Sequence, residues 1–173
     1  GGLSLNDVVY QGPDMIAKLL GVLLRSRLRP VCVMGDVSGM FSQVKVPEEQ
    51  QDALRFLWRP QGDPEEPVKE YKYVVHIFGG NWCPAAACYA LHKTADDYGA
   101  NFSDQTCMVL KRDFYVDDVI SSLDTVEEAK VLQRELKELL VRGGFNLTKW
   151  SSNKPEVLES LPDSEKSKIM QLD

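Results

Sequence analysis

The chain has 173 residues, of which 43% are hydrophobic and 27% are charged, which is the composition of a folded globular protein and excludes a disordered chain as the default. Its 20 Lys and Arg against 26 Asp and Glu give a formal charge of −6, so the global basicity usual for a protein that grips a phosphate backbone is absent. This length predicts one domain with a real core.

The cysteines and the apolar runs give two further expectations. Cys32, Cys83, Cys88 and Cys107 have no CxxC spacing, which favours free thiols over a metal or redox motif. The sequence has no secretory signal and no apolar run long enough to cross a membrane, and we therefore expect no membrane partner.

The first half of the chain predicts alternating helices and strands. Apolar residues at helical spacing follow Pro13, and arginines precede Pro30, which predicts an amphipathic helix. The next segments are predicted, in order, to be a buried strand over 30–34, a glycine-marked break over 35–39 with Asp36 at the strand's end, an alternating stretch over 41–46, and a short helix over 47–59.

The second half predicts the remaining elements of the same domain. In order, these are an exposed loop over 59–70, a strand over 70–78, a helix over 84–99, a pair of strands over 107–123, a helix opened by the capping box Thr125-x-x-Glu128, and a last strand over 144–150. The polar tail is expected to be loosely held. This order indicates an α+β fold with an antiparallel central sheet and helices packed on one face.

Asp117 and Asp118 lie side by side at the turn of the predicted strand pair. Two carboxylates about 4 Å apart repel by about 4 kcal/mol at an effective dielectric near 20, so something must offset the repulsion. One interpretation is a hairpin with a solvated acidic tip, because Asp tolerates tight turns. The other is a metal site completed by Asp36, since Mg²⁺ binds carboxylates and two such ions assist phosphoryl transfer.

Four ordered segments carry a resemblance to a known family. "GDVSGMF", "FGGNWCPAAACYALHKTA", "FYVDD" and "GGFNLTKW" resemble motifs A, B, C and D of a reverse transcriptase palm. The flanks "SLNDVVYQGPD", "GVLLRSRL", "QVKVPEEQQDALRFLW" and "KWSSN" resemble more narrowly the BEL/Pao class of long-terminal-repeat retrotransposons. The resemblance implies a palm-centred domain over 1–155, with or without part of the fingers, and a polar tail over 156–173 that leads toward a thumb.

The resemblance also implies catalytic roles. Asp36 matches the motif A metal ligand, Asp117 the principal motif C ligand, and Asp118 the more peripheral second acid. Together they would hold two Mg²⁺ ions, with Mn²⁺ as a substitute. Lys149 is the lysine nearest to the motif D candidate that protonates the departing pyrophosphate; a surface strand lysine is the other interpretation.

A second set of matches concerns the nucleotide. Phe41 matches the aromatic wall that rejects a ribose 2′-hydroxyl, with Val37 near it, and otherwise would be a core aromatic. Gly79 matches the motif B glycine that lets the backbone approach the template–nucleotide pair, and otherwise ends a strand. Phe78 stands where retroviral enzymes carry glutamine, which is a departure from the pattern. Tyr115 matches the residue beside the primer terminus, and is otherwise a half-buried strand tyrosine.

The implied function is that of an RNA-directed DNA polymerase. Its partners would be an RNA/DNA template–primer, deoxynucleoside triphosphates and the remaining fingers, thumb and RNase H segments, inside the cell in a cytoplasmic virus-like particle or in the nucleus. Because the basic fingers residues of the family would precede this segment, we expect weak or no activity from it alone. The alternative is a domesticated or truncated palm that binds protein or nucleic acid without catalysis.

Other enzyme classes fit poorly. A receiver-type phosphoacceptor places its acid pair before the single acid, whereas Asp36 precedes the pair here. An aspartic protease needs Asp-Ser/Thr-Gly, and "DVSG" inserts a residue. His76 and His92 are the only histidines, and no serine or cysteine motif accompanies them as a hydrolase triad requires.

Overall fold

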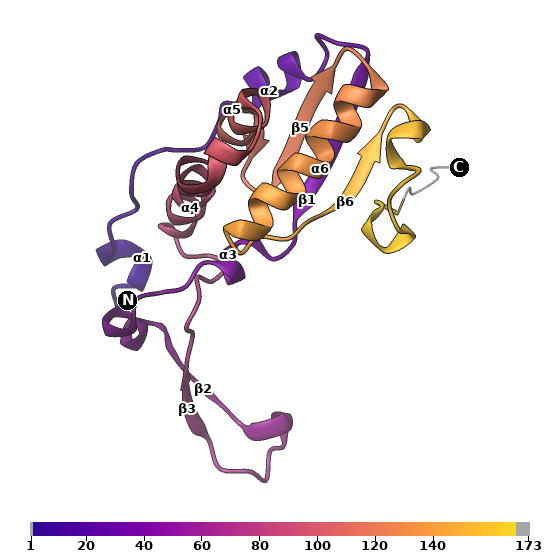
Figure 1. Ribbon diagram of the computed structural model, residues 1–173. Helices are drawn as coiled ribbons and strands as arrows, with labels where there is room; N and C mark the ends of the chain where they lie inside the picture. Colours follow the sequence, from indigo (N-terminus) through magenta and orange to yellow (C-terminus); the bar gives the residue numbers. More distant parts are fainter. Residues whose placement is uncertain (1, 169–173) are drawn as a thin grey trace.

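A four-stranded antiparallel sheet forms the centre of the protein in the computed structural model, which describes residues 2–168 (Figure 1). The strands of this sheet follow the spatial order β4-β5-β1-β6. They are β1 (Val31–Val37), β4 (Phe114–Tyr115), β5 (Asp118–Leu123) and β6 (Leu147–Ser152). A separate two-stranded ribbon pairs β2 (Arg55–Trp58) with β3 (Lys69–Lys72).

Helices form a second layer on one face of the sheet. The α-helices are α1 (Leu5–Val8), α2 (Leu19–Arg25), α3 (Met40–Gln43), α4 (Cys83–Tyr98), α5 (Asp104–Arg112) and α6 (Val126–Arg142). Helix α6 lies across β1, β5 and β6, and α4 and α5 pack beside it (Figure 1). The expected α+β fold with helices on one face is therefore confirmed.

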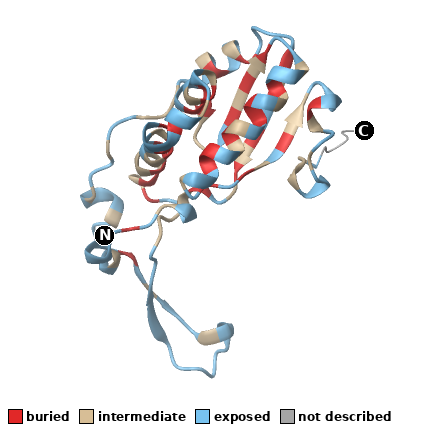
Figure 2. Ribbon diagram, in the orientation of Figure 1, coloured by how far each residue is buried: buried red, intermediate tan, exposed pale blue. Residues whose placement is uncertain are grey.

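The core lies between this helical layer and the sheet. Residues of β1 alternate, so that Val31, Val33 and Val37 are buried while Met34 on the other face is 41% exposed. Leu136 and Leu139 of α6 are fully buried in the same core, and Figure 2 shows buried stretches on both α6 and the strands of the sheet. One face of the sheet is thus left for other contacts.

The expected break at Gly35 is wrong, because β1 continues through this residue to Val37. A Cβ atom at Gly35 would lie 3.1 Å from the ring of Trp150 in β6, so the glycine makes room for an indole on the inner face of the sheet. Trp150 is fully buried there. The pairing of β1 with β6 shifts register between Met34 and Asp36, which is the irregularity that the glycine accommodates.

The β2–β3 ribbon projects away from the body of the protein (Figure 1). The sequence predicted a helix through residue 59, but a 3₁₀-helix (Glu48–Leu54) ends at Leu54 and β2 follows. Phe56 stacks on Tyr71 at 5.8 Å and packs on Tyr73 at 4.7 Å across the ribbon, which explains the extended conformation. The predicted exposed loop connects the two strands.

Four other predicted boundaries are wrong. Residues 107–112 belong to α5 and not to a strand, because Ser103 caps a helix that opens at Asp104. The helix expected from Pro13 begins only at Leu19; Asp14 accepts the amide of Ile16 before it, a contact that competes with helical hydrogen bonds. The alternating stretch after Gly39 contains the single turn α3, and the strand expected over 70–78 ends at residue 72.

The segment after β6 packs on the body of the protein as far as residue 168, contrary to the expected loose tail. Short 3₁₀-helices (Pro155–Leu158 and Asp163–Glu165) bury Val157 completely, and Glu165 pairs with Lys137 of α6. The amide of Ser167 donates to the carbonyl of Trp150 at 2.8 Å. Residues 169–173 of the predicted tail lie outside the described residues, and the domain boundary at residue 155 stays a prediction.

The predicted start and end of the helix after Thr125 and the free state of the cysteines are confirmed. Helix α6 begins after Thr125, whose hydroxyl accepts the amide of Glu128 at 3.2 Å, and it ends at Arg142 before Gly143. The four cysteines are free thiols, two of them buried. Among the described residues, no helix combines the length and the apolar character that crossing a bilayer would require.

Candidate metal and nucleotide site

The hairpin between β4 and β5 turns at Val116 and Asp117. Val116 has φ +58°, a left-handed conformation that costs a β-branched residue about 1–3 kcal/mol. The carbonyl of Asp117 accepts the amide of Val37 at 2.8 Å, and buried Phe114 and Val119 anchor the two strands in the core. The surrounding sheet therefore holds a strained turn at the acidic pair.

The strand register brings Asp36 opposite Asp118. Their Cα atoms are partners in the antiparallel pairing of β1 with β5, and Asp117 immediately precedes this pair at the turn. Asp36 is the second-last residue of β1, close to the predicted strand end. The backbone thus gathers Asp36 and the acidic pair, which lies about 80 positions later in the sequence, at one end of the sheet.

Lys149 of β6 supplies a positive charge to this cluster. Its Nζ lies 2.9 Å from Oδ1 of Asp36, while its backbone adopts φ +52°. The hydrogen bond to Asp36 and the nearby acids raise the pKa of Lys149, so the ammonium form is favoured. Lys149 thus pairs with an acid of the cluster in this structure, a contact that was not among the predicted roles.

Asp118 is the acid whose ionisation the cluster opposes most clearly. Partial burial raises its pKa, the charges of Asp117 and Asp36 raise it further, and Lys149 lowers it. A like charge directly across a strand pair destabilises the fold, and a cation placed between the carboxylates would remove that penalty. The cluster therefore has an electrostatic preference for a bound cation.

The donor set fits a hard divalent cation in its chemistry, because carboxylate oxygens are the ligands that Mg²⁺ takes. Asp36, Asp117 and Asp118 are the residues that would hold it. Within residues 2–168, however, no three acidic, histidine or cysteine side chains lie close enough together to form a complete metal site. Ion binding would require Asp36 to exchange Lys149 for the ion and the carboxylates to converge.

Phe41 and Phe78 meet in a second cluster. Their rings pack edge to face, with centroids 5.2 Å apart and planes at 87°. Phe41 lies in α3, which follows β1 directly, and the side chain of Phe78 is 76% exposed. Gly79 has φ +90°, and a Cβ atom there would meet nothing within 4 Å. The glycine is therefore required by the backbone conformation, and the space above it is open.

Val37 and Tyr115, both predicted to contact the nucleotide, lie in different environments. The side chain of Val37 is only 1% exposed and belongs to the core, so a nucleotide could meet only its backbone. Tyr115 is half-buried in β4, and its register partner is Asp118. Tyr115 therefore lies next to the acids, whereas Val37 serves mainly the packing of the sheet.

Asp113, which immediately precedes β4, stabilises the hairpin through hydrogen bonds of its buried side chain. The sequence analysis did not identify this role. The side chain of Asp113 is 2% exposed and accepts hydrogen bonds from Arg25 at 2.7 Å, Arg112 at 3.0 Å and Ser121 at 3.2 Å. The Asp113 carbonyl accepts the amide of Ile120 at 3.1 Å. This buried ion pair connects α2, α5 and β5 next to the acidic turn.

Asn6 holds the loop that carries Gly79, and it too was missed. Its side chain donates to the carbonyl of Gly79 at 2.8 Å and accepts the amide of Asn81 at 3.0 Å. In the same loop, the indole of Trp82 donates to Nδ1 of His76 at 3.1 Å. No local pattern links Asn6 with a loop that lies more than 70 positions away in the sequence.

The comparisons with known proteins concern the fold. No family model and no curated protein matches the sequence. A solved structure of the foamy viral protease-reverse transcriptase in complex with an RNA/DNA hybrid is similar, with a TM-score of 0.57 and 18% identity over 76% of this chain and 15% of that chain. The dRH form in complex with double-stranded DNA has a TM-score of 0.64 and 18% identity over 83% of this chain and 22% of that chain.

The chain spans less than a quarter of the length of these similar chains. The identity of 18% is low enough that the likeness concerns architecture. The antiparallel sheet with its helical layer therefore has a reverse transcriptase-like fold.

Proposed function

We propose that this chain is the palm of an RNA-directed DNA polymerase of the BEL/Pao class of retrotransposons, which transfers a nucleotidyl group to a primer 3′-hydroxyl. The observation that carries the proposal is the register of β1 and β5, which sets Asp36 opposite Asp118 beside the turn at Asp117. A solvated acidic tip would have no need of a third acid from a neighbouring strand.

The three acids have distinct roles in this proposal. Asp36 and Asp117 are the principal ligands, and Asp118 is the peripheral acid whose raised pKa reflects the crowding of charge. Two Mg²⁺ ions, when bound, would activate the attacking primer oxygen and stabilise the leaving pyrophosphate, and Mn²⁺ would substitute for them. Lys149, released from Asp36, donates a proton to the pyrophosphate.

The aromatic pair selects the sugar. Phe41 presents a flat, rigid ring fixed edge to face by Phe78, and this wall leaves no room for a ribose 2′-hydroxyl beside the incoming deoxynucleotide. The open space above Gly79 admits the template–nucleotide pair. Tyr115 packs against the primer terminus. The hydrogen bond from the side chain of Asn6 to the carbonyl of Gly79 holds this loop in place while the template–nucleotide pair is bound.

A template–primer is the proposed macromolecular ligand. The foamy viral structures with a similar fold were solved in complex with an RNA/DNA hybrid and with double-stranded DNA, which supports a duplex as ligand here. The chain itself has a formal charge of −6. Most of the basic contacts to the duplex would therefore come from the fingers, thumb and RNase H segments of the parent protein.

Primer extension by the parent protein tests the proposal. We expect extension on an RNA template with Mg²⁺ and with Mn²⁺, and a loss of at least about 100-fold in rate for Asp117→Asn, because a metal ligand is removed. Glu66→Gln, an exposed acid in the β2–β3 loop, is the matched control and should extend like the wild type. Metal-independent extension, or equal rates in Asp117→Asn, would contradict the proposal.

A second candidate function is supported by the state of the acidic cluster in this structure. Lys149 neutralises Asp36, and the described residues contain no complete three-ligand metal site. A palm retained as an interaction module, without catalysis, would be stable in this arrangement. Such a module would give no metal-dependent extension in the parent protein while still binding its protein or nucleic-acid partner, so the same assay separates the two functions.

A further inference from the structure

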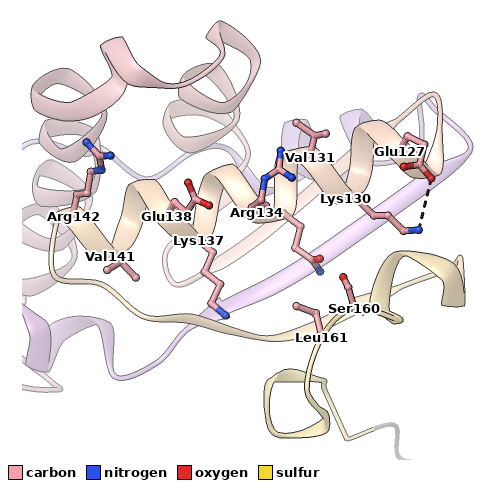
Figure 3. A pocket seen from close by; sticks show the side chains of 11 residues that line it. Glu127, Lys130, Val131, Arg134, Lys137, Glu138, Val141, Arg142, Ser160 and Leu161 are labelled. Atoms are coloured by element: carbon pink, nitrogen blue, oxygen red, sulfur yellow. Dashed lines mark ion pairs between the residues drawn. The ribbon is translucent and has the colours of Figure 1, made fainter.

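An open groove of about 860 Å³ lies on the outside of the helical layer, between α6 and the segment around Ser160 and Leu161 (Figure 3). Helix α6 packs on the sheet through its buried leucines, whereas Asp36 is on the strand face that points away from them. The groove is therefore separate from the acidic cluster, and an occupant would leave that cluster accessible.

One stripe of α6 carries positive charge along this groove. Lys130 and Lys137 point toward the Ser160–Leu161 segment in Figure 3, and Arg134 lies between them in the sequence, on the adjoining side of the helix. Lys130 makes an ion pair with Glu127 at 3.7 Å, whereas Arg134 forms no ion pair within the described residues. Lys137 already binds the carboxylate of Glu165 at one wall of the groove, which demonstrates the kind of group that the stripe accepts.

Gln133 provides an independent sign of a missing partner. Its side chain lines the groove and is only 4% exposed, yet Nε2 has no hydrogen-bond partner in the described part of the chain. An unpaired buried donor costs about 1–3 kcal/mol. A ligand that presents a carbonyl or carboxylate oxygen would remove the penalty if the side chain, whose Nε2 is covered in the free protein, turns toward the groove.

The groove also has apolar surface, which decides between two classes of ligand. Val141 is 59% exposed on the α6 wall, Leu161 lines the groove from the other wall, and Glu127 and Glu138 lie among the cations. A nucleic-acid backbone would be repelled by these two acids and would leave the apolar positions uncovered. A peptide with both carboxylates and apolar side chains matches both features.

We propose that the groove binds an acidic amphipathic segment of a partner protein. Its carboxylates pair with Lys130 and Arg134, a backbone or side-chain oxygen accepts from Gln133, and its apolar side chains cover Val141 and Leu161. Helix α6 has 17 residues, so a helical segment of similar length can run along it for about 25 Å. This interaction does not require polymerase activity.

Fluorescence anisotropy with designed probes tests the partner class. Three labelled helical peptides of about 18 residues, matched to the length of α6, share the same leucine stripe and carry Glu, Gln or Lys at every polar position. A labelled oligothymidylate is the fourth probe. We expect the Glu peptide to bind the protein at least about tenfold more tightly than the Gln or Lys peptide, through charge complementarity.

Charge reversal locates the binding. Arg134→Glu should weaken the Glu peptide by about tenfold and strengthen the Lys peptide, because the sign of the rim is changed. Arg27→Glu makes the same change of charge on an exposed arginine outside the groove, and should leave the order of affinities intact. Equal weakening by the two substitutions, or no preference for the Glu peptide, would overturn the proposal.

Gln133→Met separates binding from folding. The substitution removes an unpaired buried donor, so the thermal midpoint of the free protein should stay the same or rise, whereas the affinity for the Glu peptide should fall several-fold. In the wild type, the side-chain NH₂ resonances of Gln133 should shift when the Glu peptide is added. Unshifted resonances, unchanged affinity in Gln133→Met, or displacement of the peptide by oligothymidylate would refute this assignment.

Discussion

Two hairpins of this protein turn at acidic loops, but only one of them is supported by a core. The β4–β5 hairpin has Phe114 and Val119 almost completely buried, and its turn holds Val116 in a left-handed conformation. The β2–β3 ribbon projects into solvent with Leu57 69% exposed and Trp58 56% exposed (Figure 2). Burial therefore decides which hairpin can hold strain and fix charged side chains.

The charges of the two loops differ in the same way. Asp63, Glu65 and Glu66 in the ribbon loop are all exposed, and water solvates them. Asp117 and Asp118 share their end of the sheet with Asp36, and the pKa of Asp118 is raised. A run of acids in the sequence is therefore insufficient to indicate a site; a neighbouring strand must bring further charge to it.

The largest difference between the hairpins should appear when a supporting ion pair is removed. Asp113→Ala removes a buried carboxylate that accepts hydrogen bonds from Arg25 and Arg112, and we expect the free energy of unfolding to fall by about 1.5–3 kcal/mol, because the two arginines that lose this partner are partly exposed to water. Urea denaturation measures this loss. Glu70→Ala, which breaks the exposed pair with Arg55 in the ribbon, should leave stability nearly unchanged. Equal losses would remove the distinction.

A smaller effect concerns metal affinity at the acidic end. Lys149→Gln removes the cation that pairs with Asp36, so Mn²⁺ should bind about 3- to 10-fold more tightly, since a nearby like charge no longer opposes it. The free Mn²⁺ signal in electron paramagnetic resonance measures the affinity. Lys69→Gln makes the same change in the ribbon and should have no effect on affinity. Weaker binding in Lys149→Gln would mean that Lys149 assists metal binding.

The charge of Asp118 should give a smaller, pH-dependent change in stability. Because the folded protein raises the pKa of this carboxyl above its unfolded value, ionisation of Asp118 destabilises the fold. Asp118→Asn should therefore increase the free energy of unfolding at pH 7 by up to about 1 kcal/mol, the range for a cross-strand pair of like charges.

The same advantage should disappear in acid. Well below a pH of about 4, which is near the unfolded pKa of Asp, wild-type Asp118 is protonated in both states and the two proteins should be equally stable. Urea titrations at a series of pH values measure the difference. Glu66→Gln in the ribbon loop should show no gain at any pH, and a pH-independent gain in Asp118→Asn would assign the effect to packing.

The sequence predicted the elements whose ends are marked by local residues, such as a capping residue or a proline. Thr125 caps α6, and Pro84 lies in the first turn of α4. Strand β6 begins within the predicted stretch 144–150 and continues to Ser152, with Trp150 buried in the core. In each of these segments, spacing and capping agree with the tertiary environment. The α+β architecture followed from their order.

Where local patterns left the type or the end of an element open, tertiary contacts determined it. The short apolar run within α5 is compatible with a strand or a helix. Ser103 selects the helix by capping it, and the same hydroxyl bonds Glu135 of α6 at 2.6 Å, a contact between residues 32 positions apart. At Gly35, the indole of Trp150 determines that the strand continues, and no local signal around Gly35 indicates this.

The candidate site also has features that the sequence predicted and features that it did not. The four motifs predicted that Asp36 and the acidic pair would converge, and the strand register places Asp36 and Asp118 opposite each other; their roles as metal ligands stay predictions. The pairing of Lys149 with Asp36 could not be predicted, because it depends on a left-handed backbone at Lys149. The hydrogen bond from Asn6 to Gly79 could not be predicted either, because the sequence near Asn6 does not indicate that the two segments meet in the fold.

The smallest effect is expected at the exposed aromatic of the ribbon. Trp58→Ser removes a large side chain that is 56% exposed and has no core to leave empty, so the free energy of unfolding should change by no more than about 0.5 kcal/mol. Trp150→Phe alters the fully buried indole against Gly35 and should be clearly destabilising in the same urea titration. If Trp58→Ser costs more than about 1 kcal/mol, the ribbon contributes to the cooperative fold. Contacts with the sheet would then stabilise the ribbon. Both hairpins would contribute to the stability of the fold, and they would differ only in function.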